Sequence, residues 1–312
     1  MTPDGVSAPV PDRTGTGDPA VSVLGLGPMG APMARNLLRT YGPVTVWNRT
    51  EAKSRALVDL GAQPALTPYE AAAAVTLTVL PDLPQVESLM AGDRGLLAGW
   101  AAHGITAPVL VVHGTVSPVA VAAFAESVWS RHGVRVIDAP LSGGTIGATN
   151  ATLSIMVGGH EPTARSLMPL FAHLGRTIRY LGPSGSGALA KICNQIVVAA
   201  TVAALSEAML LARDSGLDLN LLRELLQGGL ARTEVLQQKG DNWLNESFEG
   251  GGSATNQLKD LRFAEEVAGA RSLRLPTTER VTELFEHMVS QGLGHLDHTG
   301  LYRTIAHRSS MT

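Results

Sequence analysis

One stretch of the chain carries an ammonium and two amides at helical spacing. Residues 185–195 read Gly-Ser-Gly-Ala-Leu-Ala-Lys-Ile-Cys-Asn-Gln, and an apolar run follows them. Side chains three and four positions apart are neighbours on a helix, so Lys191, Asn194 and Gln195 share one face. On an apolar helix these groups need polar partners or a wet cavity. Lys191 is therefore either a satisfied structural lysine at a domain interface or an ammonium that can give a proton to a negatively charged oxygen.

Ser142, Gly143 and Gly144 form a second candidate site. They follow a predicted strand at residues 134–138. A serine followed by two glycines exposes a hydroxyl and backbone amides, which suits the binding of a carboxylate or an oxyanion. A flexible turn is the alternative interpretation of the same residues.

A third pattern lies between a predicted buried strand at residues 20–24 and a predicted amphipathic helix at residues 31–38. The turn between them consists of Gly25, Leu26, Gly27, Pro28, Met29 and Gly30. The first glycine permits the tight turn, the second lets the backbone approach a pyrophosphate, and the third lets the helix pack against the strand. The helix N-terminus adds amide donors and a positive potential. With a second predicted strand at residues 44–47, the pattern favours a dinucleotide site over a merely structural turn.

The residues after that second strand indicate which dinucleotide is bound. A domain that prefers NAD usually has a carboxylate here for the ribose 2′-hydroxyl, whereas this chain has Asn48, Arg49 and Thr50. Asn48 has no charge to repel a 2′-phosphate, Arg49 can hydrogen-bond it and stack on adenine, and Thr50 adds a hydroxyl. We therefore predict NADP as the preferred cofactor. The alternative is that Arg49 is simply a solvated residue after a strand.

The alternation of strands and helices continues along the first half. Helices are predicted near residues 51–60, 68–74 and 85–90, and strands at residues 75–80, 109–112, 152–158 and 177–181. Because the carboxyl ends of parallel strands face the ligand crevice, the backbone of Leu80, Pro81 and Asp82 is expected to line the cofactor. Thr115 follows the next strand and is expected to meet the nicotinamide end.

Several of these segments together resemble the β-hydroxyacid dehydrogenase family, which contains the 3-hydroxyisobutyrate dehydrogenases and the glyoxylate and succinic semialdehyde reductases and is similar to 6-phosphogluconate dehydrogenase. The segments that carry the resemblance are residues 25–30, 115–118, 138–144, 187–195, 259–261 and 294–297. Several motifs in the same order are far more specific than one glycine pattern. The run Val-Thr-Val-Trp-Asn-Arg-Thr at residues 44–50 is similar to the NADPH-using semialdehyde reductases of this group.

The resemblance implies a role for each candidate. Lys191 would be the catalytic acid or base, Asn194 would hold the substrate, and Gln195 on the same face is a further substrate-binding candidate. The segment 142–144 would bind the substrate carboxylate, and Lys259 would lie near the nicotinamide and the substrate. The implied reaction is NADP-dependent reduction of a small aldehyde or keto acid to the hydroxyacid. An ammonium that protonates the forming alkoxide typically contributes about 10²–10⁴-fold to such a rate.

The chain departs from the family beside Thr115. The family often has Ser or Thr where this chain has Gly114, and the neighbouring His113, which we interpret as structural, is unusual. A hydroxyl that would help to hold a carboxylate is absent, which leaves the substrate open and keeps an imine reductase-like enzyme as an alternative. Imine reductases generally lack a lysine at the position of Lys191. A non-catalytic NADP-binding scaffold is the alternative from another class, although it would not need Lys191 and Asn194 together.

Length and composition predict two domains. At 312 residues, of which 45% are apolar, the chain exceeds the size at which one core usually stops growing. We predict a disordered tail at residues 1–19, a doubly wound α/β Rossmann domain that binds NADP at residues 20–182, and an all-α substrate and dimerisation domain at residues 183–312. A long interdomain helix joins the two domains.

The net charge and the residue composition limit the classes of partner that we expect. The formal net charge is −3 without a long basic run, so we expect a small-molecule substrate and neither nucleic acid nor a membrane. The histidines show no metal-ligand spacing, and no metal is expected. The apolar helix predicts burial against a second subunit, and the resemblance implies a homodimer or homotetramer. The single cysteine, Cys193, is expected to be buried and suits a reducing cytoplasm.

Overall fold

The computed structural model of the protein describes residues 18–309. The chain divides into two compact units, and the division falls between Lys191 and Ile192, inside one long helix. The predicted tail at residues 1–19 lies outside the described residues except for its last two. Of these, Pro19 accepts a hydrogen bond at its carbonyl oxygen from the hydroxyl of Tyr41 at 2.7 Å.

The first unit is built on one sheet. In the described residues the strand order is β3-β2-β1-β4-β5-β6-β8-β7, and β9 pairs with β8. The strands are β1 (Val21–Leu24), β2 (Val44–Trp47), β3 (Gln63–Pro64), β4 (Val75–Thr78), β5 (Val109–Val112), β6 (Arg135–Asp138), β7 (Leu141–Ser142), β8 (Leu153–Gly159) and β9 (Gly175–Gly182). Strands β1 to β6 are parallel, and β8 is antiparallel to β6. The chain order reverses beside β1, which is the switch point where open α/β sheets bind ligands. The predicted doubly wound fold is confirmed.

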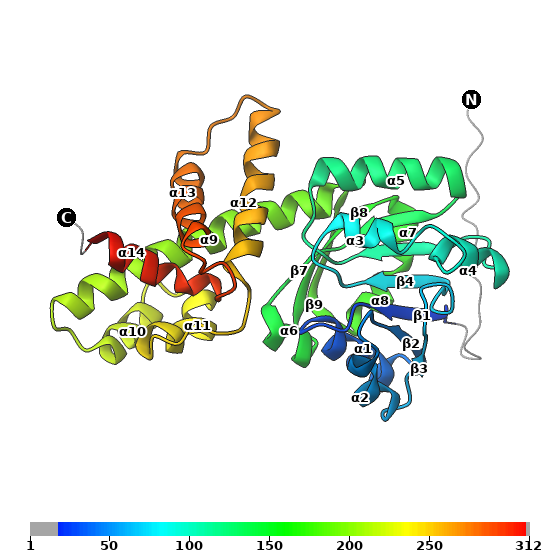
Figure 1. Ribbon diagram of the computed structural model, residues 1–312, viewed down its shortest axis with the longest axis horizontal. Coiled ribbons are helices and arrows are strands. Elements are labelled where there is room, and N and C mark those ends of the chain that lie inside the picture. Colours follow the sequence, from blue (N-terminus) through cyan, green and yellow to red (C-terminus); the bar gives the residue numbers. More distant parts are fainter. Residues whose placement is uncertain (1–17, 310–312) are drawn as a thin grey trace. The chain divides into compact units, whose positions relative to one another are not determined.

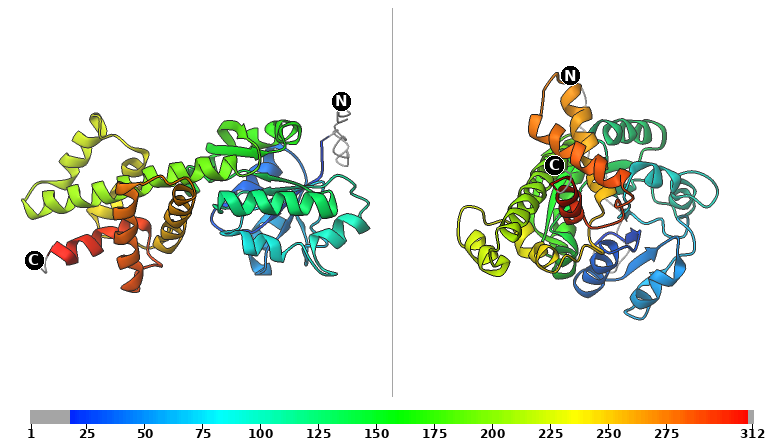
Figure 2. Two further views of the ribbon diagram at one scale, coloured as in Figure 1. Left: turned by 90° about the horizontal axis from the view of Figure 1, so that it is seen from above. Right: turned by 60° about the vertical axis from the view of Figure 1, so that its left-hand side comes forward.

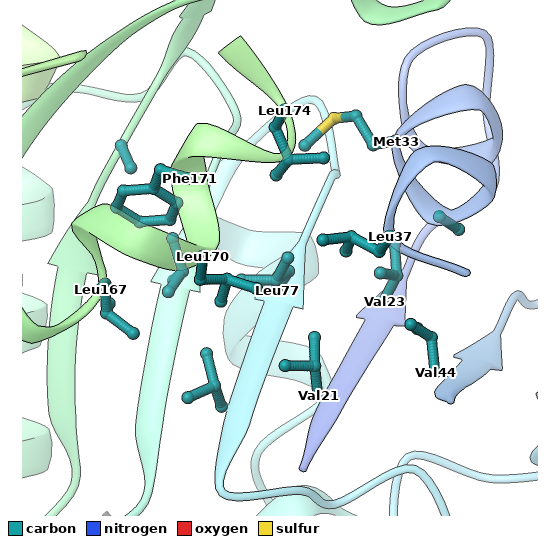
Figure 3. Close-up of a cluster of buried hydrophobic side chains, with 14 of the residues drawn as sticks. Val21, Val23, Met33, Leu37, Val44, Leu77, Leu167, Leu170, Phe171 and Leu174 are labelled. Carbon is teal, nitrogen blue, oxygen red and sulfur yellow. The ribbon is translucent and has the colours of Figure 1, made fainter. Parts of the chain in front are cut away.

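Helices cover both faces of this sheet (Figure 1). They are α1 (Gly30–Thr40), η1 (Glu51–Ser54), α2 (Arg55–Val58), α3 (Leu83–Ser88), α4 (Leu96–Ala102), α5 (Pro118–His132), α6 (Gly144–Asn150), α7 (Glu161–Ser166) and α8 (Met168–Ala172). On one face, Leu37 of α1 and Leu170 of α8 pack with Leu77 of β4 (Figure 3). Strand side chains alternate between faces, and on the other face Trp100 of α4 and Phe124 of α5 form a separate core. The sheet is therefore buried on both sides, as its continuous apolar strands require.

Five strand ends of this sheet lie in one row. In the register of the sheet, the last residues of five neighbouring strands pair side by side. In order across the sheet they are Trp47, Leu24, Thr78, Val112 and Asp138. Because these strands are parallel, the segments after them leave the sheet at the same edge. The topology thus brings the predicted cofactor segments together, although they are spread over residues 25–115.

The second unit is helical. Helix α9 (Ser186–Asp214) begins in the first unit and continues into the second. It is followed by α10 (Leu219–Gly228), α11 (Glu234–Leu244), α12 (Ala254–Gly269), α13 (Pro276–Ser290), η2 (His298–Gly300) and α14 (Leu301–Ser309). Helices α12 and α13 pack side by side (Figure 2). Trp243, Phe248 and Phe285 lie in the apolar core of this unit.

Helix α9 is unusually apolar. Within residues 18–309 it is the one helix whose length and composition would allow it to cross a membrane, with a mean hydropathy of 1.8 over its most apolar window. A single such helix is weak evidence for a membrane span, because the central helix of a folded core has the same character.

Two expectations about local structure are wrong. Residues 68–71 form a turn and residues 72–74 are not helical, where a helix was expected. The carbonyl oxygens of Ala72 and Ala73 accept hydrogen bonds from the side chains of His103 and Trp100. Those carbonyls are therefore directed toward α4. Cys193 is exposed where a buried side chain was expected. Val197 and Leu211 of α9 are also exposed in the described chain, and the burial of this helix against a second subunit stays a prediction.

Candidate active site

The glycine turn after β1 meets the steric demands of a pyrophosphate site. Gly25 has a φ of +100°, and a Cβ there would lie 2.5 Å from the carbonyl oxygen of Val79. A Cβ on Gly30 would lie 1.9 Å from the carbonyl oxygen of Gly25, so α1 can begin this close to the strand only with glycine. Gly27 differs, because a Cβ there would have no neighbouring atom within 4 Å. That open side is the space through which a phosphate group can approach the backbone.

The start of α1 is also suited to an anion. Met29 occupies the N-cap position, and no side chain caps the helix there. The first amides of a helix lack partners within the helix, and they favour a negatively charged group at this end. The glycine turn and the start of α1 therefore fit the phosphates of a dinucleotide.

Asn48 ties the end of β2 to the glycine turn. Its Oδ1 accepts a hydrogen bond from the amide of Leu26 at 2.9 Å, and its Nδ2 donates to the carbonyl oxygen of Thr50 at 2.9 Å. Both polar atoms of this side chain are thus used within the protein, and Asn48 acts on the cofactor site by holding the turn. The side chains of Arg49 and Thr50 are exposed beside it, where they can reach a 2′-phosphate.

The segments after β4 and β5 pack closely against each other. A Cβ on Gly114 would lie 2.1 Å from the carbonyl oxygen of Leu80, so a serine or threonine there would require the backbone to move. This contact gives a steric reason for the glycine that distinguishes this chain. The carboxylate of Asp82 caps α3 by accepting from the amide of Gln85 at 3.0 Å, and the predicted contact of its backbone with the cofactor remains a prediction. Leu80, Asp82, Thr115 and Ser142 are half-buried, and Pro81 is exposed.

His113 belongs to the core of the first unit. Its Nδ1 lies 2.6 Å from the carbonyl oxygen of Ala139, and its ring meets the Phe171 ring edge-on, with 5.9 Å between centroids. Burial lowers the pKa of His113 to about 4, although the bond to Ala139 acts in the opposite direction. The ring is therefore neutral at pH 7, and its Nδ1–H donates. Its Nε2 has no hydrogen-bond partner among the described residues. These contacts fit the structural interpretation of this histidine.

The Ser-Gly-Gly segment joins β7 to α6. Gly143 and Gly144 have φ angles of +125° and +62°, which residues with a side chain rarely adopt. Helix α6 packs on α1, where Nδ2 of Asn36 donates to the carbonyl oxygen of Ala148 at 2.7 Å. The glycine turn therefore leads into α1, and the segment that is predicted to bind a carboxylate leads into α6. These two helices pack against each other.

Lys191 lies one turn after a helix start that is held on β6. The carboxylate of Asp138 accepts hydrogen bonds from the amides of Gly185 at 2.9 Å and Ala188 at 2.8 Å. Burial raises the pKa of Asp138 to about 6, although these amide bonds lower it. Lys191 itself is only 9% exposed. The predicted catalytic lysine is thus a nearly buried group close to the last strand of the row.

In the second unit, three predicted site residues are joined through Asp260. Nε2 of Gln195 donates to Oδ2 of Asp260 at 2.6 Å. Oε1 of Gln195 accepts from Nδ2 of Asn194 at 3.1 Å, and Nζ of Lys259 lies 3.1 Å from Oδ1 of Asp260. Gln195 therefore orients Asn194 and links α9 to α12. Its predicted contact with the substrate remains a prediction.

Comparison with known proteins identifies the family. Residues 20–182 match the NAD binding domain of 6-phosphogluconate dehydrogenase, and residues 185–305 match the NAD-binding family of NADP-dependent 3-hydroxyisobutyrate dehydrogenase. The 2-hydroxy-3-oxopropionate reductase of Escherichia coli is 36% identical over 292 residues, which cover 90% of this chain and 95% of the relative. The chain belongs to the β-hydroxyacid dehydrogenase family.

Solved structures agree with this family. The 3-hydroxyisobutyrate dehydrogenase of Mycobacterium tuberculosis, solved with L-serine, is 26% identical with a TM-score of 0.76, covering 92% of this chain and 99% of that one. An imine reductase from a Pseudomonas species shares the fold, with a TM-score of 0.58 at 21% identity over 92% of this chain and 99% of that one. This member of the family is therefore an oxidoreductase that uses a pyridine nucleotide.

Two buried carboxylates of this β-hydroxyacid dehydrogenase were not among the predicted functional side chains. Asp138 ends a buried strand, and Asp260 follows Lys259 on the buried side of α12. A carboxylate at such a position must be compensated by amides or cations, which is the signal that identifies both in the sequence. Within residues 18–309, no group of three or more His, Cys, Asp or Glu side chains is arranged to hold a metal ion.

Proposed function

We propose that the protein reduces a small aldehyde or keto acid, such as a semialdehyde, to the hydroxyacid with NADPH, and that Lys191 is the acid. The observation that carries this proposal is the hydrogen bonding between the start of α9 and Asp138. Asp138 is the last residue in the row of strand ends, and the glycine turn follows Leu24 in the same row. Adjacent strands are about 4.8 Å apart, so the three spacings from β1 to β6 span about 14 Å. A dinucleotide with its pyrophosphate on the glycine turn can extend along this row toward Lys191.

The residues of the chain supply the proton and the substrate contacts. When bound, the cofactor supplies a hydride to the carbonyl carbon. The ammonium of Lys191 gives its proton to the carbonyl oxygen that gains charge, and solvent returns a proton to the amine. The amide of Asn194 holds a substrate oxygen, and the amides of residues 142–144 bind the carboxylate. In alcohol oxidation the lysine must first lose its proton, so that direction is favoured at alkaline pH.

A preference for NADP is part of this proposal. It is supported by the exposed guanidinium of Arg49, which lies next to the tie between Asn48 and the glycine turn. An arginine binds a phosphate through charge-assisted hydrogen bonds. The 2′-hydroxyl of NAD offers no charge to that group.

A homodimer or homotetramer is also proposed. Helix α10 has no buried residue, and its leucines Leu221 and Leu225 are exposed one turn apart. Only 39% of the most apolar window of α9 is buried. Exposed apolar side chains on these helices are typical of an interface, and a second copy presents the same side chains for a two-fold contact. A cytoplasmic location remains a prediction from the single cysteine.

The proposed reaction is tested with a substrate panel and a lysine variant. NADPH oxidation is measured with glyoxylate, succinic semialdehyde, methylmalonate semialdehyde and cyclic imines. The protein should turn over at least one aldehyde, and Lys191→Ala should bind NADPH normally while losing about 10²–10⁴-fold in kcat. Cys193→Ala, on another face of α9, is the matched control and should keep wild-type kcat.

The same panel separates the competing functions. Turnover of imines alone would replace the carbonyl reductase by an imine reductase. A protein that binds NADPH but turns over no member of the panel would support the scaffold alternative. Near-normal kcat in Lys191→Ala would reject the role of this lysine.

A further inference from the structure

Asp138 is a buried carboxylate that has no direct place in the proposed reaction. It is the last residue of β6, pairs with Val112 of β5 and Gly158 of β8, and is 1% exposed. Burial raises its pKa, and bonds from backbone amides lower it. Its partners are backbone amides at the start of α9.

Those amides and the carboxylate compensate each other. Oδ1 accepts from the amide of Gly185 at 2.9 Å, and Oδ2 accepts from the amide of Ala188 at 2.8 Å. The nearby amide of Gly187 also lowers the pKa of this carboxyl. The first amides of a helix have no partner within it, and the helix dipole favours a negative charge at this end. One carboxylate thus satisfies several amides that would otherwise be buried without an acceptor.

The contact leaves no free space around the helix start. A Cβ on Gly158 would lie 2.6 Å from the amide nitrogen of Gly187 and 2.7 Å from Oδ2 of Asp138. A Cβ on Gly187 would lie 2.2 Å from the carbonyl oxygen of Met156. Two glycines at facing positions therefore let the first turn of α9 rest directly on the strands. Close packing and the bonds to Asp138 together fix the distance of this first turn from the sheet and its rotation about the helix axis.

We propose that Asp138 is the positioning residue of Lys191. Ala188, which donates to Asp138, precedes Lys191 by three residues, or about 4.5 Å along the helix axis. A helix start held at this point sets where the lysine side chain leaves α9. A displacement of about 1 Å at a reacting group can cost about 10²-fold in rate, so a loosened anchor acts on catalysis through the ammonium. This inference rests on the proposed role of Lys191 in the reduction.

The test is a double-mutant cycle between Asp138 and Lys191. Asp138→Asn keeps the size of the side chain but directs an NH₂ group at an amide N–H. We expect kcat to fall by about 10- to 100-fold while the Kd for NADPH changes by less than about twofold, because the glycine turn lies at β1. In the background of Lys191→Ala, Asp138→Asn should cause no further loss, since the group that it positions is gone.

A second aspartate provides the matched control. Asp218 caps α10 by accepting from the amide of Asn220 at 2.8 Å, and α10 carries no predicted site residue. Asp218→Asn removes a carboxylate from the start of another helix, at an exposed local cap, and should leave kcat unchanged. Asp138→Ser, which keeps one acceptor for the helix start, serves if Asp138→Asn does not fold.

Each outcome supports or overturns the inference. An equal loss from Asp138→Asn in the wild-type and Lys191→Ala backgrounds would show a general structural effect and overturn it. So would wild-type kcat in Asp138→Asn, or failure of both Asp138 variants to fold. If Lys191→Ala keeps near-normal kcat, the proposed function fails. If Lys191→Ala loses kcat as expected and Asp138→Asn lowers the residual kcat by the same factor as in the wild type, only the positioning role fails.

Discussion

Replacing Arg49 by alanine is expected to reduce the preference for NADPH over NADH about ten- to a hundredfold. Asn48 uses its amide on Leu26 and Thr50, and the hydroxyl of Thr50 is neutral. Arg49 is therefore the one charged side chain among residues 48–50. A hydrogen bond to a charged group contributes about 1.5–3 kcal/mol, and about 1.4 kcal/mol corresponds to tenfold in affinity.

The assay compares kcat/KM for the two cofactors with one substrate. In Arg49→Ala, kcat/KM for NADPH should fall while that for NADH stays within about twofold, because NADH lacks the phosphate that the guanidinium binds. The difference should shrink at high ionic strength, since the site is exposed and salt screens it. Arg176→Ala, which removes an exposed arginine from β9, is the control and should leave the ratio unchanged. An unchanged ratio in Arg49→Ala would refute this explanation of cofactor preference.

Three further predictions concern stability and assembly. Gly114→Ser should lower the Tm and raise the KM for NADPH, because its Cβ would lie 2.1 Å from the carbonyl oxygen of Leu80; improved turnover of an acid substrate with an unchanged Tm would contradict this. Burial lowers the pKa of His113 from 6.5 to about 4, so on acidification the unfolded chain binds this proton first. The neutral ring contributes fully to the free energy of unfolding above about pH 6.5, and this contribution falls by about 3 kcal/mol as the pH approaches 4. In urea titrations at these pH values, His113→Gln, which retains an N–H donor, should not show this loss of unfolding free energy. Leu221→Glu combined with Leu225→Glu should lower the mass measured by light scattering to that of a monomer, whereas a mass unaffected by both changes would place the subunit contact elsewhere.

Local sequence patterns determined most of the elements. The strands at residues 44–47 and 109–112 were predicted with the observed bounds, because a short apolar run between turn residues has few other conformations in a buried sheet. The glycine turn was also predictable, since its requirements are steric and involve neighbours in the chain. The family motifs added the proposed roles of Lys191 and Asn194, which periodicity alone had left open between a structural and a catalytic interpretation.

Residues 68–74 illustrate where local propensity fails. Their composition favours a helix, but the carbonyls of Ala72 and Ala73 bond to the side chains of His103 and Trp100. Those partners come from α4, about thirty residues away in the chain, and only the fold places them there. A helix over residues 68–74 would leave these two carbonyls without a partner of its own, so the side-chain bonds hold the path of the segment into β4 and displace no helical bond.

What the sequence by itself determined is the set of residues that can do chemistry and the strands and helices that carry them. The tertiary structure alone decided how each is held: Asn48 on the glycine turn, Gly114 against Leu80, and the start of α9 on Asp138. The physical reason is that these bonds and close approaches join segments 22 to 50 residues apart. Their partners are set by strand order and register, and no periodicity within one segment records them.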